Sequence, residues 1–243
     1  MAKLIFQGSK SNKIIKRKKV SLRAEKELWK KGYKYVAGLD EAGRGPLAGP
    51  VVAGAVMLNS KFTLLNAAKR QSRSACGAGL FNRVKDSKKL SAKKREEFYK
   101  ILTKHPAIEW GIGIVSEKII DKINIKNAAE LAMVRALKSL KLKPDFLIID
   151  GGHVKNLKLK IKNSKLIVKA DEKVFSCAAA SILAKVTRDR IMEKFQKKFP
   201  RYGFDKHKGY PTREHIKRLK KYRPCRIHRM TFTPVLESLK RKA

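Results

Sequence analysis

Residues 35–52 read YVAGLDEAGRGPLAGPVV, and this stretch decides the fold class of the chain. Residues 35–39 are apolar, as short strands are, and two acids follow them directly. Residues 43–46, with two glycines and a proline, predict a turn. The valine-rich run 51–58 is a second predicted strand, which we expect to pair with the first. The stretch therefore predicts a sheet in which the first strand ends in carboxylates.

The rest of the chain predicts an α/β domain with a mixed sheet. We expect strands at 108–115, 146–149 and 166–168. We also expect four helices: one that begins at Ser91, one from Asn124 to about residue 140, one that includes residues 175–186, and one after Thr212. The order is three strands in succession, helices, two strands and a long helix. The last two strands are too apolar for half-exposed hairpins, so we expect both of their faces to be covered.

The charge of the chain favours a nucleic-acid partner. The 243 residues are enough for one good-sized domain, or for one domain with a small appendage. Lys and Arg number 60 and Asp and Glu 20, which gives a net charge of +40. Repulsion within so basic a chain destabilises a compact state unless a polyanion neutralises it. We therefore expect nucleic acid as the partner, with an anionic membrane surface as the alternative, and small cationic substrates are disfavoured.

The cysteines and the hydropathy pattern predict a cytoplasmic protein without a membrane partner. Cys76, Cys177 and Cys225 lie far apart and form no CxxC motif, which argues against a disulfide framework. The longest uncharged apolar run, residues 45–59, is interrupted by glycine and proline. It is also shorter than the ~18–20 residues of a membrane-spanning helix. The N-terminus lacks the apolar stretch of a signal peptide.

Two segments differ in composition from the rest of the chain. Residues 1–33 form a basic extension with 11 Lys and Arg against Glu25 and Glu27. This extension is either a solvated tail or amphipathic surface helix, or an arm that binds phosphates. Residues 61–84 are polar, contain two glycines and show no periodicity, which predicts a loop or insertion.

Three sets of acids directly follow apolar strands: Asp40 with Glu41, Asp150, and Asp171. Functional sites collect at strand ends in α/β sheets. Adjacent acids on a strand point to opposite faces, but at a frayed end both can reach one ion. Gathered carboxylates repel one another unless a cation lies between them, and oxygen ligands select Mg²⁺ or Mn²⁺. The alternative is that each acid belongs to a turn or pairs with a surface lysine.

The stretch 35–52 resembles the opening motif of ribonuclease HII, the type 2 ribonuclease H family. Similar stretches follow in family order over roughly residues 34–237. They read DSKKLS at 86–91, LIIDG at 147–151, KAD at 169–171, AAASILAKVTRD at 178–189, YGF at 202–204, HKGYPT at 207–212 and IHR at 227–229. The resemblance implies an RNase H-like fold, with a mixed five-stranded sheet flanked by helices and a small C-terminal helical part.

The resemblance also implies a role for individual residues. The catalytic and metal-binding acids of the family match Asp40, Glu41, Asp150 and Asp171. The motif whose backbone reads the ribose 2′-OH matches Gly43, Arg44 and Gly45. Its glycines have no Cβ atom, which lets the minor groove of the substrate come close to the backbone. The tyrosine that stacks on the deoxyribose after the ribonucleotide matches Tyr210. The residues near the substrate backbone match Lys88, Lys89 and Lys185.

The implied reaction is hydrolysis of the RNA strand of an RNA–DNA hybrid, or cleavage 5′ to a single ribonucleotide in duplex DNA. It leaves a 5′-phosphate and a 3′-hydroxyl and uses two divalent ions, Mg²⁺ or Mn²⁺. The implied organisation is an RNase H-like catalytic domain at 34–200 and a C-terminal helical substrate-binding part at 201–243. The resemblance further implies a monomer that acts in ribonucleotide excision repair and DNA replication.

Other hypotheses stay open at this point. A non-catalytic RNA-binding protein would use the charge alone, but it has no need of acids after strands. Another nuclease with an RNase H-like fold would lack the motifs around Arg44 and Tyr210. Arg44 could also serve only as an ion-pair partner for the acids. A zinc site is the alternative to ordinary loop residues for Cys225 and His228 with His207 or His215.

Overall fold

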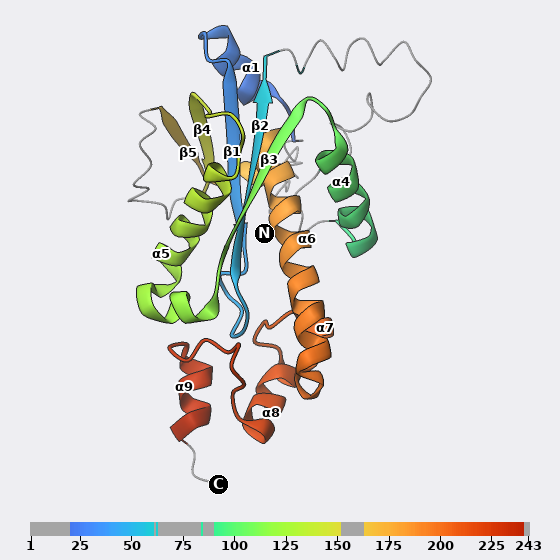
Figure 1. Ribbon diagram of the computed structural model, residues 1–243, viewed down its shortest axis with the longest axis vertical. Coiled ribbons are helices and arrows are strands. Elements are labelled where there is room, and N and C mark those ends of the chain that lie inside the picture. The colour runs from blue at the N-terminus through green and yellow to red at the C-terminus, as the bar shows by residue number, and fades with distance from the viewer. Residues whose placement is uncertain (1–19, 61, 63–83, 85–89, 152–162, 241–243) are drawn as a thin grey trace, which may run out of the picture.

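The computed structural model describes residues 20–60, 62, 84, 90–151 and 163–240, and its centre is a five-stranded mixed sheet (Figure 1). The strands are β1 (Tyr35–Ala42), β2 (Val51–Asn59), β3 (Ile108–Val115), β4 (Phe146–Asp150) and β5 (Ser164–Ile167). The first three form an antiparallel meander, whereas β4 pairs parallel to β1 and β5 parallel to β4. The spatial order is β3-β2-β1-β4-β5, which confirms the predicted mixed sheet.

Helices cover both faces of the sheet because successive strand residues point to opposite sides. In β2, Val56 and Leu58 pack with α4 (Ala92–Lys104) and α6 (Phe175–Lys198). Ala55 and Met57 of the same strand pack on the other side. There they meet α5, which spans Glu117–Lys138. Figure 1 shows α5 on one side of the strands and α4 and α6 on the other.

The helix α6 packs unusually close to the sheet. A Cβ atom built on Gly38 would lie 2.4 Å from the carbonyl carbon of Ser176, and one on Gly54 would lie 2.4 Å from the carbonyl oxygen of Ala180. Both strand positions therefore need glycine. The first turns of α6 are small residues, SCAAAS at 176–181. Small residues on both sides bring Ser181 up to β1, where the predicted acids lie.

Part of the basic extension packs on this domain. The helix α1 (Arg23–Lys30) follows Ser21, which forms a bridge with Val174. Glu25 is fully buried and accepts a hydrogen bond from the backbone N–H of Ser176 (2.8 Å). Residues 23–30 therefore form an amphipathic helix, as one interpretation of the extension expected, and phosphate binding by the extension stays a prediction. Residues 1–19 lie outside the described residues.

The C-terminal part forms a separate layer beneath the turn between β1 and β2 (Figure 1). Its elements are the 3-10 helix η3 (Pro200–Tyr202), α7 (Phe204–His207), α8 (Arg213–Tyr222) and α9 (Thr233–Lys240). Leu47 and Ala48 of the β1–β2 turn are buried among their apolar side chains. The turn therefore packs into the C-terminal part, and Ala48 shares its cluster with Met192 of α6.

Three sequence expectations need correction, and a fourth is extended. The helix α4 separates the second strand from the third, so the three strands are not in direct succession. The strand β1 continues through Ala42, so the acids at 40 and 41 lie within it rather than after it. The helix expected from Asn124 is confirmed, because the Oδ1 atom of Asn124 accepts from the N–H groups of residues 126 and 127 and the helix runs to Lys138; a further helical segment from Glu117, which the sequence did not predict, precedes the kink at Asn124. The strand β5 is the edge of the sheet and is not covered on both faces, since Leu166 is 48% exposed.

Of the predicted insertion 61–84, only Phe62 and Val84 lie within the described residues, and both are buried beside α4 and α6. Among the described helices, none is long and apolar enough to cross a bilayer.

Candidate active site

Three aspartates from three separate elements meet at one end of the sheet. Asp40 lies on β1, Asp150 is the last residue of β4, and Asp171 lies on the 3-10 helix η2 (Ala170–Glu172). Because β1 and β4 are adjacent and parallel, their carboxyl ends lie side by side. One carboxylate oxygen from each aspartate lies within 4.8 Å of those of the other two. The expected convergence of acids therefore holds for these three.

Local hydrogen bonds orient the aspartates. The Oδ1 atom of Asp150 accepts from the backbone N–H of Ala170 (2.9 Å), which links the end of β4 to η2. Lys169, in the left-handed conformation (φ 56°), turns the chain into η2. The hydroxyl of Ser181 on α6 hydrogen-bonds to the carboxylate of Asp40. The close packing of α6 is what allows this last contact.

The electrostatics of the group suit a divalent cation. Asp40 is 6% exposed and Asp171 3%. Burial raises the pKa of Asp40 well above its ordinary value, and the negative charges of Glu41, Asp150 and Asp171 raise it further. Carboxylates that lie close together and shielded from water repel one another unless a cation neutralises them. Carboxylate oxygens are suitable ligands for Mg²⁺ and Mn²⁺. The donor set and its burial therefore fit a divalent metal site.

Glu41 occupies a different position from the three aspartates. It follows Asp40 within a paired strand, so its side chain starts on the opposite face. Its Oε1 atom accepts from Nη1 of Arg44 (3.2 Å). Arg44 thus does pair with an acid, as the alternative interpretation held. Glu41 is not a member of the close aspartate group, because β1 stays regular where the sequence analysis expected a frayed end.

A cavity of about 330 Å³ opens beside these acids. It is lined by Asp40, Glu41, Ala42, Gly43, Arg44, Gly45, Asp150, Gly151, Ser181, Lys185 and Tyr210. The cavity thus brings together three of the predicted acids, the turn at 43–45, and the candidates Lys185 and Tyr210. Lys88 and Lys89, the remaining candidates, lie outside the described residues.

The two glycines of the turn at 43–45 differ in the space around them. Gly43 has φ +98°, and a Cβ atom there would lie 2.2 Å from Nε of Arg188. Gly45 differs, because the nearest atom to its Cβ position would be Cε1 of Tyr210 at 3.9 Å. Gly43 is therefore required by the protein's own packing, whereas Gly45 leaves space open on the cavity side.

Lys185 and Tyr210 form the far wall of the cavity. The Nζ atom of Lys185 lies 5.6 Å from the ring centroid of Tyr210, which is 38% exposed. The same Nζ donates to Oδ1 of Asp189 (2.8 Å), and the other carboxylate oxygen of Asp189 lies 3.8 Å from a guanidinium nitrogen of Arg95. Burial lowers the pKa of Lys185, and its bond to Asp189 opposes that shift. Asp189 therefore pairs with one cation on α6 and lies near a second on α4.

The residues of the zinc hypothesis lie close together, but they are not arranged as the ligands of one metal ion. The rings of His207 and His215 stack at 4.3 Å, and the Nε2 atoms of His215 and His228 lie 3.2 Å apart. The other ring nitrogen of His228 faces the N–H and Sγ of Cys225. Within the described residues, three or more metal-ligating side chains converge only at the three aspartates. The histidines and Cys225 are therefore a packed polar cluster.

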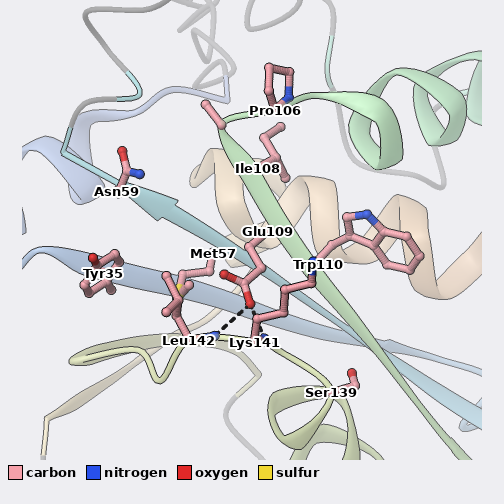
Figure 2. A pocket seen from close by; sticks show the side chains of 11 residues that line it. Tyr35, Met57, Asn59, Pro106, Ile108, Glu109, Trp110, Ser139, Lys141 and Leu142 are labelled. Atoms are coloured by element: carbon pink, nitrogen blue, oxygen red, sulfur yellow. Dashed lines mark hydrogen bonds between the residues drawn. The ribbon is translucent and has the colours of Figure 1, made fainter.

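A larger cavity, of about 510 Å³, lies at the opposite end of the strands (Figure 2). Tyr35 begins β1 there and Asn59 ends β2 opposite it. The carboxylate of Glu109 accepts from the backbone N–H groups of Lys141 and Leu142, as the dashed lines in Figure 2 show. Glu109 is the only carboxylate among the described residues that line this cavity. Since the cavity gathers no set of reactive groups, the smaller cavity beside the aspartates is the candidate active site.

Three residues of this region escaped the sequence analysis as individuals. Ser181 contacts Asp40, and the buried Arg188 and Arg229 contact the turn at 43–50. All three lie inside motifs that were quoted for the family resemblance. Nothing in a single sequence distinguishes them from their neighbours, because their roles depend on contacts over more than 130 residues of chain.

Comparisons with known proteins agree with this geometry. The family model described as Ribonuclease HII matches residues 37–235. A ribonuclease HII of Caldicellulosiruptor bescii is 44% identical over 215 residues, 88% of this chain and 94% of that protein. One from Acetivibrio thermocellus is 49% identical over 209 residues, 86% of this chain and 73% of that protein. The crystal structure of ribonuclease H2 from Pyrococcus horikoshii superposes with a TM-score of 0.65 at 30% identity, covering 84% of this chain and 96% of that one.

Proposed function

The chain belongs to the ribonuclease HII family, an endoribonuclease family that acts on the RNA of RNA–DNA hybrids, and from this premise we propose its finer activity. We propose that it also cuts duplex DNA on the 5′ side of an embedded ribonucleotide, leaving a 5′-phosphate and a 3′-hydroxyl. The observation that carries the proposal is the cavity that Asp40 and Asp150 line together with Gly43–Gly45 and Tyr210, with Asp171 close to both aspartates. Family membership excludes the non-catalytic RNA-binding protein considered above.

Asp40, Asp150 and Asp171 would hold the divalent metal, and Glu41 lies next to them on β1. Two bound Mg²⁺ or Mn²⁺ ions would supply an activated water and stabilisation of the leaving oxygen. The protein's own contribution is orientation. Ser181 holds the Asp40 carboxylate, and the Ala170 N–H holds that of Asp150. With these contacts the carboxylates are arranged before substrate binds, so little reorganisation is needed during the reaction.

The other wall of the cavity would recognise the substrate. The backbone at Gly43, Arg44 and Gly45 lines the cavity, and an accessible backbone can hydrogen-bond a ribose 2′-OH. Tyr210 presents an exposed ring for the next deoxyribose, and Lys185 presents a cation for the phosphate backbone. Lys88 and Lys89 belong to this proposal on the family resemblance alone.

The organisation of the chain belongs to the same proposal. Residues 34–200 would form the catalytic domain and residues 201–243 the substrate-binding part, with residues 1–33 as a basic extension. We propose a monomeric enzyme of the cytoplasm that serves ribonucleotide excision repair and DNA replication. Free thiols at Cys177 and Cys225 support a reducing compartment.

The test is cleavage of a DNA duplex that carries one ribonucleotide. Wild type should nick it 5′ to the ribonucleotide with Mg²⁺ or Mn²⁺ and leave it intact in EDTA. Asp150→Asn should lose at least ~10³-fold in kcat, because it removes a charge from the metal site. Glu130→Gln on α5, which replaces an acid by an amide far from the cavity, should cleave like wild type.

Cleavage of long RNA–DNA hybrids by the same samples completes the experiment. Wild type that cuts hybrids but leaves the single-ribonucleotide duplex intact would restrict the function to hybrids. Cleavage of plain DNA at the same rate would contradict the proposed role of residues 43–45 in reading the 2′-OH.

A further inference from the structure

Two arginines outside the proposed machinery have an unusual environment. Arg188 on α6 and Arg229, which follows the buried His228, are both 0% exposed. Charged side chains are rarely buried fully unless an opposite charge accompanies them. Within the described part of the chain, neither guanidinium lies within 4.0 Å of a carboxylate. Their burial therefore needs another explanation.

Backbone carbonyls take the place of the missing carboxylates. The nitrogens of Arg188 donate to the carbonyls of Ala48, Pro50 and Lys208 at 3.0–3.1 Å. The nitrogens of Arg229 donate to the carbonyls of Gly43, Arg44, Gly49 and Pro50 at 2.6–3.2 Å. All but one of these carbonyls belong to residues 43–50. The two side chains thus hold the β1–β2 turn from within.

This arrangement sets the direction of the peptide groups that line the cavity. In a planar trans peptide the C=O and the following N–H point in opposite directions. Arg229 draws the carbonyls of Gly43 and Arg44 toward itself. The N–H groups of Arg44 and Gly45 are therefore directed away from Arg229, and both residues line the cavity.

Arg188 connects the turn with the other recognition element. Besides its bonds to the turn it donates to the carbonyl of Lys208 (3.0 Å), and its guanidinium lies 5.7 Å from the ring centroid of Tyr210. Backbone bonds run beside it, from the N–H of Leu47 to the carbonyl of Gly209 (2.8 Å) and from the N–H of Gly49 to that of Ile227 (2.8 Å). The turn and the segment of Tyr210 therefore form one unit.

We propose that Arg188 and Arg229 are positioning residues for substrate selectivity: they hold residues 43–50 at a fixed place relative to Tyr210, so that the turn discriminates a ribonucleotide from a deoxyribonucleotide. The inference rests on the proposed function and deepens it. Arginine suits this role because its planar group offers five donors in a fixed arrangement, whereas lysine offers a point charge. Neither arginine contacts the reacting atoms in this account.

The experiment uses Arg188→Lys and Arg229→Lys, which keep the charge and remove the planar set of donors. Dissociation constants are measured without divalent ions for a duplex with one ribonucleotide and for the same duplex made of DNA alone. Wild type should prefer the ribonucleotide duplex. Each variant should lose that preference by ~10-fold, through weaker binding of the ribonucleotide duplex and little change for DNA. The KM for cleavage should rise correspondingly, while kcat changes less.

Arg135→Lys is the matched control. Arg135 also donates to a backbone carbonyl, that of Ile114, but it lies on α5, away from the turn. This variant should bind and cleave as wild type does. A variant in which binding of both duplexes falls by the same factor would show a merely structural role and overturn the inference. Wild type that binds both duplexes equally would also overturn the inference, because the turn would then give no selectivity in binding, whereas wild type that does not cleave the ribonucleotide duplex would contradict the proposed function.

Stability is checked in parallel, because either substitution can unfold the protein. Circular dichroism identifies an unfolded variant, and the other variant then carries the test, since the two arginines come from separate segments. Hydrogen exchange on wild type needs no variant. The amides of Leu47 and Gly49 should exchange slowly, because both donate within the unit. Rapid exchange of both amides would show that the turn is not held and would overturn the inference.

Discussion

At the scale of single residues, the site depends on glycines that serve opposite purposes. Gly54 has no room for a side chain, because a Cβ atom would lie 2.4 Å from the backbone oxygen of Ala180. Gly45 has room, since its nearest neighbour would lie at 3.9 Å. The first glycine serves the packing of α6 against the sheet, and the second leaves the cavity open.

These two environments predict different effects of the same substitution. Gly54→Ala should lower the free energy of unfolding by about 2–3 kcal/mol, because the backbone of α6 must move away from β2. Gly45→Ala should change it by less than about 0.5 kcal/mol. Urea denaturation measures both values. Equal losses of stability in the two variants would contradict this account.

At the scale of elements, α1 acts as a cap for α6. The helix α6 begins after Val174, whose side chain cannot cap it, and the N–H of Ser176 donates instead to the distant Glu25. Burial raises the pKa of Glu25, although the hydrogen bonds from Ser176 oppose the shift. The carboxylate is thus useful as an acceptor and costly as a buried charge.

This balance predicts opposite behaviour for two substitutions at Glu25. Glu25→Ala removes the acceptor and should cost about 1–2 kcal/mol of stability at pH 7. Glu25→Gln keeps an acceptor oxygen without the charge, so it should be at least as stable as wild type at pH 7. Because the pKa of Glu25 is raised in the folded protein, ionisation of this carboxyl lowers the free energy of unfolding as pH rises above about 4.5. The uncharged Gln side chain avoids this loss at neutral pH. Urea denaturation at pH 7 measures the stability of both variants. Equal losses of stability would contradict the role of Glu25 as the acceptor that caps α6.

At the scale of the whole molecule, the C-terminal part carries an acid-sensitive cluster. His215 and His228 are 0% and 1% exposed, and burial lowers the pKa of each to about 4. Both are below the ordinary value of 6.5, so the unfolded chain binds protons that the folded chain excludes. The stability from this cluster is complete above pH 6.5 and is lost as pH falls toward 4.

Acid denaturation checks this expectation. Stability should fall between pH 6.5 and 4 by about 3 kcal/mol for each of the two histidines that must gain a proton. His228→Gln removes one titrating group and should show a smaller fall over the same range. An equal fall in wild type and variant would assign the pH dependence to other groups.

The charge of the whole chain predicts how substrate binding responds to salt. Seven of the Lys and Arg residues lie in residues 1–19, outside the segment that packs as α1. If these residues bind phosphates, their deletion should weaken duplex binding. It should also reduce the slope of log Kd against log salt by about 0.9 for each phosphate that the arm neutralises in the full chain. Fluorescence anisotropy over a series of salt concentrations measures the slope, and an unchanged slope would exclude the arm as a phosphate binder.

The sequence by itself determined the local elements and the chemistry of the site. Apolar runs and caps such as Ser91 and Thr212 identified strands and helices, because periodicity and capping are local properties. Acids expected after strands, Asp40 with Glu41, Asp150 and Asp171, predicted a metal site, because functional sites collect at strand ends in α/β sheets. The family motifs added Gly43–Gly45 and Tyr210, which the fold then brought to the same cavity.

Only the tertiary structure decided which side chains touch. It joined three aspartates but left Glu41 with Arg44, because β1 stays paired past the acids. It left β5 uncovered, since the position of a strand at a sheet edge depends on topology and not on its own residues. It also turned Arg188 and Arg229 inward to backbone carbonyls. Such contacts join segments far apart in the chain, and nothing local to either segment encodes them.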